Sequence, residues 1–499
     1  MKILQKSFRR SDHSPSAQKS QSLASLNIPL MRMGEQVRFL ICAILFGGCL
    51  VLGGGGGGFA DSLLQILSLL VILIAVWRCI TLPALPDIPL LIVFAGILLL
   101  AAIQITPLSP SVWKHLDGRA ELLQQMAAVG IRPSWYSLTL SPTATERALF
   151  WTLPGMAMYL STFSMTTQAR ARLVVMLLVV AAFSLLLGLG QIGSGPDSLL
   201  SFYGNGTISY AIGFFSNRNH FACMLAMAIP LAVGLLISKL IEQRSTRVIS
   251  KPWLAFLLVV IVSILIALPL TGSRAGIVLG ALAVFGSLGL LLRARMGRRI
   301  ALAAMAIGVV ILFVGLLLGI DKLLPRLEQD PASEARWTIH ATTSVAAHHF
   351  GPLGSGLGTF VAAYQAVAPE RDILPQYINH AHSDYHELWL ETGWLGVVLI
   401  GVFLLWYFWR SWQVWRRSEV PSMALNLARA ASVSIAVVLA HSWVDYSLRK
   451  SAIIALLGLC CALLSRNVKV AAPDTASFQA SAGPERDDRP RIDKSKGAF

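Results

Sequence analysis

The chain has 499 residues, of which 55% are apolar and only 13% are charged, and its mean hydropathy is +0.66. This composition excludes an ordinary soluble protein, because apolar stretches of about 18 residues or more recur along the chain, as membrane-spanning helices require. The net charge of +16 could suit nucleic acid, but the basic residues gather in short segments between the apolar stretches, as in the cytoplasmic loops of membrane proteins, so we expect no nucleic-acid partner.

Residues 1–37 are polar and basic, and we expect them to form a disordered cytoplasmic tail. Residues 38–466 then contain about twelve apolar stretches that are long enough to span a membrane. Their approximate bounds are 39–59, 62–77, 88–106, 148–166, 173–192, 219–238, 253–271, 275–292, 300–320, 388–408, 423–442 and 451–465. Long apolar runs favour helices over a β-barrel, and residues 467–499 form a second polar tail. The sequence therefore predicts an all-α polytopic membrane protein.

The positively charged segments predict how the chain is oriented. They follow the second, fourth, sixth, eighth, tenth and twelfth apolar stretches, on the same side as the amino terminus. Positively charged loops stay in the cytoplasm, so both termini are predicted to be cytoplasmic. Residues 107–147 and 321–387 then face outward, and the longer loop, 321–387, is periplasmic if the cell is Gram-negative. A loop of that length is usually functional or disordered.

Three arginines are predicted to lie on the outer side, against this charge rule. They are Arg218 in GFFSNRNHFA (213–222), Arg274 in LTGSRAG (270–276) and Arg336 in SEARWTIH (333–340). Such residues often extend to the membrane surface or pair with an acid, and Glu334 lies close to Arg336. Arginines at membrane level also suit a diphosphate or another anion on a lipid, because a guanidinium group binds phosphate through two parallel hydrogen bonds. Asn217 and Asn219 could add neutral hydrogen bonds to a sugar or phosphate.

The polar stretch HAHSDYHE (380–387) closes the long outer loop. His382 and His386 share one face if a helix begins here, and Ser383 or Asp384 would cap that helix. HELWL departs from the metal-binding pattern HExxH, because Leu390 takes the place of the second histidine, so we predict no metal site. A neutral histidine could accept a proton from a hydroxyl group; the other interpretation is a histidine of the membrane interface without a chemical role.

Glycine-rich segments offer less information. GPLGSGLGTF (351–360) predicts a tight turn, which either lets backbone amides approach a ligand or is a turn only. The run of six glycines at 53–58 has no predicted chemistry.

Together these motifs resemble the O-antigen ligase and O-antigen polymerase superfamily of bacterial membrane glycosyltransferases. The resemblance rests on GFFSNRNHFA, TGSRAG, the arginine at 336 ahead of PLGSGLGTF, and HAHSDYHELWLETGWLG (380–396). Their order and spacing match the family over about residues 210–400, including the large outer loop. HSWVDYSL (441–448) is similar to a carboxy-terminal motif of some members. The family usually has leucine in place of His386, and His382 fits the register of the motif better.

The resemblance implies a GT-C-like transferase of the bacterial inner membrane whose active site faces the periplasm. The donor would be a glycan on undecaprenyl diphosphate. The acceptor would be a hydroxyl group of lipid A-core or of a growing polysaccharide, in the biosynthesis of lipopolysaccharide or exopolysaccharide, and no cofactor or metal would be needed. By motif, Arg218 and Arg274 would bind the diphosphate, Arg336 would line the same cavity and His382 would activate the acceptor. Their supporting neighbours would be His380, Asp384, Tyr385, Asn217 and Asn219.

Two other functions remain open at this point. A protein O-oligosaccharyltransferase shares the same motifs, so the sequence does not separate it from a ligase or a polymerase. A transporter, such as a flippase of lipid-linked sugars, would also suit many spans with charged residues inside them. A transporter needs access from both sides of the membrane, however, whereas the polar motifs gather on one side, which favours an enzyme.

Overall fold

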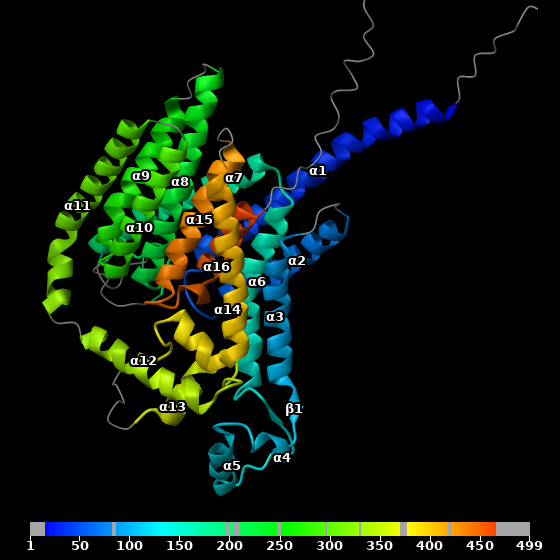
Figure 1. Ribbon diagram of the computed structural model, residues 1–499, viewed down its shortest axis with the longest axis vertical. Helices are drawn as coiled ribbons and strands as arrows, with labels where there is room; N and C mark the ends of the chain where they lie inside the picture. The colour runs from blue at the N-terminus through cyan, green and yellow to red at the C-terminus, as the bar shows by residue number, and fades with distance from the viewer. Residues whose placement is uncertain are drawn as a thin grey trace, which may run out of the picture.

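The computed structural model of the protein describes residues 15–81, 86–194, 200, 202–203, 210–246, 251–294, 297–328, 331–369, 377–417 and 422–465. Within these ranges the chain is nearly all helical (Figure 1), and nine helices are long and apolar enough to cross a membrane. The prediction of an all-α polytopic membrane protein is therefore confirmed. Two short strands of the described ranges, β1 (Pro107–Leu108) and β2 (Tyr136–Ser137), pair antiparallel.

The nine candidate spans lie in α1 (Pro15–Leu52), α2 (Phe59–Thr81), α3 (Ile88–Ile105), α7 (Thr167–Gly193), α8 (Arg218–Thr246), α9 (Lys251–Leu270), α10 (Arg274–Arg293), α14 (Asp384–Arg416) and α15 (Met423–His441). The other helices are α4 (Pro110–Trp113), α5 (Arg119–Ala128), α6 (Pro142–Phe163), α11 (Arg298–Glu328), α12 (Pro331–His349), α13 (Phe360–Val367), α16 (Ser451–Leu464) and the 3-10 helix η2 (Ser447–Arg449). Helices α6, α11 and α16 occupy the other three predicted spans, and α16 has only 14 residues. The predicted count of twelve is not confirmed.

Two segments outside the predicted spans contain helices. Helix α1 begins at Pro15, so residues 15–37, expected within a disordered tail, are helical. Residues 1–14 and the second expected tail, 467–499, lie outside the described residues. The predicted outer loop 321–387 contains α12, α13 and the end of α11, so much of this segment is helical.

The centre of the bundle is α8 packed against α15. Apolar side chains surround α8 and almost all of it is buried, as expected for a helix enclosed by protein. Small residues let the two helices approach closely. A side chain at Gly234 would meet Ala430 and the carbonyl group of Asn426, and the Ser434 hydroxyl donates to the Met227 carbonyl at 2.7 Å. This contact joins the interior of α8 to the interior of α15.

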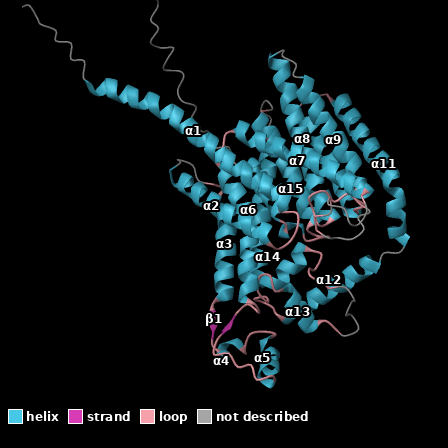
Figure 2. Cartoon of the chain, turned by 180° about the vertical axis from the view of Figure 1, so that it is seen from behind, coloured by secondary structure: helices cyan, strands magenta, loops and turns pink. Residues whose placement is uncertain are grey.

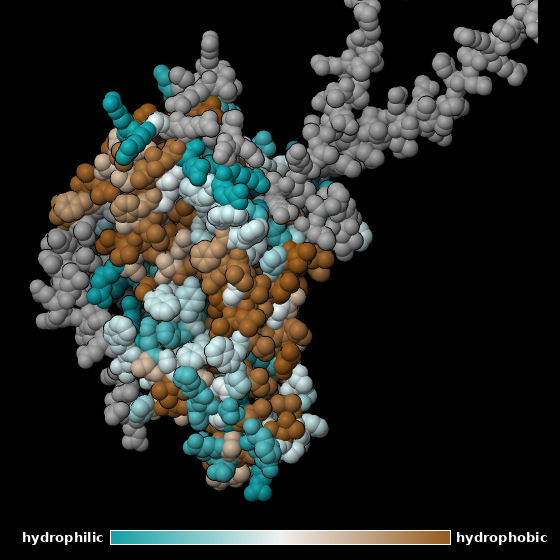
Figure 3. Space-filling view, in the orientation of Figure 1, coloured by the Kyte–Doolittle hydropathy of each residue, from teal (hydrophilic) through white to brown (hydrophobic). Residues whose placement is uncertain are grey.

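The remaining helices form two flanks. Helices α9, α10 and α11 lie on one side of α8 and α15, and α2, α3 and α6 lie on the other, with α14 and α16 between them (Figure 1). Apolar side chains cover much of the bundle, and hydrophilic side chains gather toward its two ends (Figure 3). Helices α12 and α13 lie across the end at which α8, α10 and α14 begin, and α4 and α5 project beyond that end (Figure 2).

The projecting segment is fastened to the bundle by Arg119, whose side chain is buried. Its guanidinium group donates to the carbonyl of Leu138 at 2.9 Å and to the carbonyl of Gly354 at 2.7 Å. The segment between α3 and α6, which holds β1, α4, α5 and β2, is thereby joined to the glycine-rich turn at 351–360.

Candidate active site

Four segments next to helix ends meet at the end of the bundle where α8, α10 and α14 begin. They are 210–217 before α8, 271–273 before α10, 377–383 before α14 and 442–450 after α15. The Asp445 carboxylate, in the last of these segments, contacts the first turn of α8 and the segment before α14. Its Oδ2 accepts a hydrogen bond from Asn219 Nδ2 at 2.8 Å, and its Oδ1 lies 3.4 Å from His382 Nδ1 and 3.8 Å from His220 Nε2. Asn219 Oδ1 in turn accepts from Ser273 Oγ at 2.8 Å. Motifs far apart in the sequence therefore form one cluster.

The Asp445 carboxyl group is almost fully buried, with 1% of its side chain exposed. Burial alone would raise its pKa, but its contacts with His220 and His382 lower the pKa well below the usual range. The backbone N–H of Tyr446 also donates to Oδ1 at 2.9 Å. Asp445 is therefore ionised at neutral pH and provides a fixed negative charge beside the histidines.

His382 has an unusual backbone conformation. Its φ of +53° is left-handed, which is rare for a residue with a side chain and costs on the order of 1–3 kcal/mol. The turn is held because Ser383 caps α14, accepting from His386 N, and because Asp384 N donates to the end of α15 at 2.9 Å. The His382 side chain, 28% exposed, contacts Asp445. The expectation that His382 and His386 share a helix face is wrong, since His382 precedes the helix.

Helix α12 adds His340 and Arg336 to the same region. The His340 ring stacks on the ring of His386, with centroids 4.7 Å apart. Burial lowers the pKa of His340, and the positive charge of Arg336 lowers it further. Arg336, one helical turn before His340, therefore lies near the histidines. His386 Nδ1 lies 3.1 Å from the Ser383 hydroxyl, so the two histidines of the motif have different partners.

A layer of buried charges supports the histidine loop. The His380 ring stacks on Tyr446 with centroids 3.9 Å apart, and its Nδ1 lies 2.9 Å from Glu387 Oε1. Glu387 and Glu391 are both buried on α14. The guanidinium group of Arg449 lies 3.3 Å from Glu387 and 2.7 Å from Glu391. One cation thus joins the loop after α15 to two carboxylates of α14.

Arg218 and Arg274, the two arginines expected to bind anions, are the first residues of α8 and α10. Both side chains are half-buried. The Arg218 guanidinium lies over the ring of Tyr210, 4.6 Å from its centroid, and that ring packs so closely on Gly272 that a side chain there would overlap it. Tyr210 therefore brings the turn that carries Arg218 against the turn that carries Arg274.

The predicted supporting residues divide into two groups. Asn217, Asn219 and His380 belong to the cluster, and Asn217 Oδ1 accepts from Asn219 N at 2.8 Å. Asp384 and Tyr385 instead have partners on other helices. Asp384 Oδ2 accepts from the backbone N–H of residue 448 at 3.2 Å, and the Tyr385 hydroxyl donates to the carbonyl of residue 439 at 2.9 Å.

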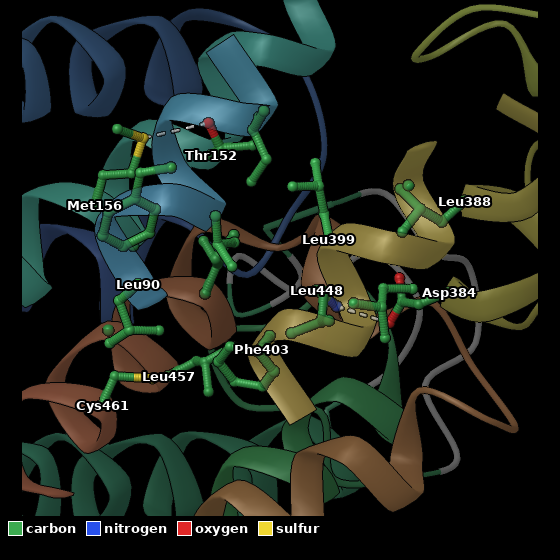
Figure 4. Close-up of a pocket in the computed structure, with 18 of the residues that line it drawn as sticks. Leu90, Thr152, Met156, Asp384, Leu388, Leu399, Phe403, Leu448, Leu457 and Cys461 are labelled. Carbon is green, nitrogen blue, oxygen red and sulfur yellow. Dashed lines mark hydrogen bonds between the residues drawn. The ribbon is translucent and has the colours of Figure 1, made fainter. Parts of the chain in front are cut away.

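Asp384 and Tyr385 also line a cavity of about 230 Å³ between α3, α6, α14 and α16 (Figure 4). Its other walls are mostly apolar, with Leu90, Leu399 and Phe403 among the side chains that face it. The cavity therefore lies within the helical bundle, directly beside the start of α14.

The glycine-rich turn at 351–360 uses its backbone amides within the protein. Ser355 N donates to the Leu390 carbonyl and Gly356 N to the Glu391 carbonyl, both at 2.9 Å. Gln104 joins the same backbone from α3, donating to the Glu391 carbonyl and accepting from Leu357 N, again at 2.9 Å. Of the two predicted roles for this segment, these amides fulfil the structural one.

Sequence reasoning missed several members of the cluster, above all Asp445, Tyr446 and Arg449. A signal was available, because Arg449 and Lys450 are basic residues between the last two predicted spans, where the charge rule expects few. Among the described residues, no group of three or more His, Cys, Asp or Glu side chains is arranged to hold a metal ion.

Comparison with known families bears on the same residues. The sequence model of the O-antigen ligase family matches residues 258–401, a range that includes Arg274, Arg336 and His382, whereas Arg218 and Asp445 lie outside it. A search of curated proteins gave no match. Residues 258–401 are therefore similar to the O-antigen ligase family, in agreement with the resemblance that the motifs indicated.

Proposed function

We propose that the protein transfers a glycan from undecaprenyl diphosphate to an acceptor hydroxyl group of lipid A-core or of a growing polysaccharide. The reaction would take place at the periplasmic face of the bacterial inner membrane, with both termini in the cytoplasm. The positively charged segments between the helices support this orientation. The apolar cavity beside Asp384 is compatible with substrates that carry hydrocarbon chains.

The observation that carries the proposal is the meeting of His382 with the turns that bear Arg218 and Arg274. His382 contacts Asp445 at 3.4 Å, and Asp445 is joined through Asn219 to the turn before α10. A histidine that could accept a proton is thus linked by hydrogen bonds to the turns that carry two arginines suited to a diphosphate, which supports the proposal.

The proposed reaction is a single displacement at the anomeric carbon of the donor sugar. The acceptor oxygen forms a bond to that carbon while its proton moves to His382. The bond between the carbon and the diphosphate oxygen breaks, and its electron pair leaves with undecaprenyl diphosphate. Arg218 and Arg274 stabilise the charge that develops on the diphosphate, which is the largest contribution expected because the leaving group is already good. Arg336 would line the same cavity.

Glycan transfer in proteoliposomes tests this proposal. The purified protein is supplied with undecaprenyl-diphosphate oligosaccharide and with candidate acceptors, and His382→Ala is compared with His115→Ala, which changes an exposed histidine of the outer segment. We expect wild type and His115→Ala to release undecaprenyl diphosphate and to form a larger glycan. Loss of the general base should slow His382→Ala by about 10²- to 10⁴-fold. Full activity is expected in EDTA, since the proposed steps use side chains alone.

The products also separate the related functions. The new partner at the reducing end of the glycan distinguishes a ligase, a polymerase and a protein O-oligosaccharyltransferase. Undiminished transfer by His382→Ala would refute the assignment of the base. Movement of the lipid-linked sugar between leaflets without any transfer would identify a transporter.

A further inference from the structure

We propose that Asp445 is a positioning residue of the transfer reaction, which sets the tautomer of His382 and fixes the distance between that histidine and the anion-binding turns. This inference rests on the proposed function. Asp445 lies 63 residues beyond His382 in the sequence and outside the range matched by the family.

The first step of the argument concerns the tautomer. A carboxylate can only accept hydrogen bonds, so the contact of Asp445 Oδ1 with His382 Nδ1 places the proton of the neutral imidazole on Nδ1. Nε2 then keeps its lone pair and is the nitrogen that can take the acceptor proton. The carboxylate also stabilises the imidazolium that forms when this proton arrives, as in other histidine bases held by an aspartate.

The second step concerns distance. The other oxygen of the same carboxylate, Oδ2, accepts from Asn219, the residue after Arg218. Asn219 accepts from Ser273, whose hydroxyl also accepts from Gly276 N at 3.0 Å and so caps the helix that Arg274 begins. A continuous chain of hydrogen bonds therefore runs from the base to both arginine turns. Fixed geometry between reacting groups lowers the barrier because the ordering is complete before the reaction.

Other titratable or charged groups surround Asp445 and His382 and could affect the pH dependence of the reaction. His220, Tyr446 and His441 face Asp445, and Lys450 acts on it through its charge. Tyr446 and His340 face His382. None of these groups replaces the carboxylate as an acceptor for His382 Nδ1 in the described part of the chain.

The pH dependence of glycan transfer in proteoliposomes gives the first readout. Asp445→Asn keeps the shape of the side chain but removes its charge, so kcat should fall by about 10²- to 10⁴-fold. The imidazolium that forms on His382 loses its stabilising partner, so the acid limb of the pH–kcat profile should move to lower pH. Asp61→Asn is the matched control, because Asp61 is a buried aspartate that contacts Gly57 and Ser451, and its profile should match wild type.

A double-mutant cycle gives the second readout. If Asp445 acts through His382, Asp445→Asn should cause no further loss in the His382→Ala background. Equal losses in both backgrounds, or a wild-type pH profile for Asp445→Asn, would overturn the inference. If Asp445→Asn does not give a monodisperse protein, Asp445→Glu keeps the charge and should keep the acid limb in place; a shifted limb, or failure of both variants to fold, would assign Asp445 a purely structural role.

These outcomes are separate from those of the proposed function. If wild type transfers no glycan, the proposed function fails. If wild type is active and His382→Ala is inactive, but Asp445→Asn behaves like wild type, only the role of Asp445 is refuted.

Discussion

Arg274 and Arg218 occupy the same position on two helices, the first residue of α10 and of α8. At that position the positive end of the helix dipole adds to the positive charge of the side chain. The two helices start at the same end of the bundle, so both contributions act on one region. An anion bound there would meet two guanidinium groups and two helix starts together.

Replacement of Arg274 should therefore impair transfer, and the loss should depend on how much of the charge and hydrogen bonding of arginine the new side chain keeps. Arg274→Ala should abolish detectable activity. Arg274→Lys keeps the charge but loses the planar pair of donors, so kcat/KM for the donor should fall by about 10- to 100-fold. Steady-state transfer at varied donor concentration measures both values. Arg293→Lys, at the exposed opposite end of α10, should be unaffected, and an active Arg274→Ala protein would exclude the assigned role.

At the level of single residues, the sequence predicted what depended on local signals. Arg218, Arg274 and His382 can be proposed from the sequence because arginines that break the charge rule and a polar stretch are visible without a structure. Asp445 was not found, because its partnership with His382 depends on how the loop after α15 packs against the start of α14. The left-handed backbone of His382 was equally hidden, since Ser383 correctly predicted the cap but not the turn before it.

Among the elements, α14 contains a kink at Gly393. Gly393 has φ +57° and ψ −147°, a region that is essentially open to glycine alone. A side chain there would overlap the carbonyl oxygen of Pro352, in the glycine-rich turn. Gly401, on the same helix, has open space around the position of a side chain.

Gly393→Ala and Gly401→Ala should therefore have opposite effects on stability. Gly393→Ala should destabilise the protein by more than about 3 kcal/mol, because overlap adds to a backbone strain of about 1–3 kcal/mol. Gly401→Ala should be neutral or stabilising by up to about 1 kcal/mol, as for glycine within a helix. Thermal unfolding in detergent compares the two variants. Similar melting temperatures would contradict the claim that the kink requires glycine at position 393.

The ion cluster of Arg449 with Glu387 and Glu391 connects η2 to α14. Arg449→Met leaves two buried carboxylates without their cation, so we expect a loss of about 3–5 kcal/mol in stability. Thermal unfolding should show this loss, and Arg293→Met at an exposed position should not. The double variant Arg449→Met/Glu391→Gln removes one of the unpaired charges and should recover part of the stability; no recovery would mean that the cluster is not held by its charges.

At the scale of the whole molecule, every apolar stretch that was predicted to span the membrane coincides with a helix. Hydropathy alone did not predict which of these helices are long and apolar enough to cross it. Helix α6 is largely buried by its neighbours, so it needs fewer apolar residues than a helix that faces lipid. Helices α12 and α13 could not be predicted from hydropathy, because they lie across the end of the bundle. The side of the membrane on which each loop lies is predicted from charge alone, and a labelling experiment tests it.

Helix α11 connects the two positions that best test this sidedness. Arg293, at the end of α10, and Val345, on α12 with 58% of its surface exposed, lie toward opposite ends of α11 (Figure 1). In a cysteine-free background, Val345→Cys should react with a membrane-impermeant maleimide on intact spheroplasts, and Arg293→Cys should react only after permeabilisation. Positively charged loops are retained in the cytoplasm, so this pattern puts His382 and both arginine turns outside, where the lipid-linked glycan is proposed to be. The reverse pattern would place the cluster in the cytoplasm, and labelling of both positions from outside would mean that α11 does not cross the membrane.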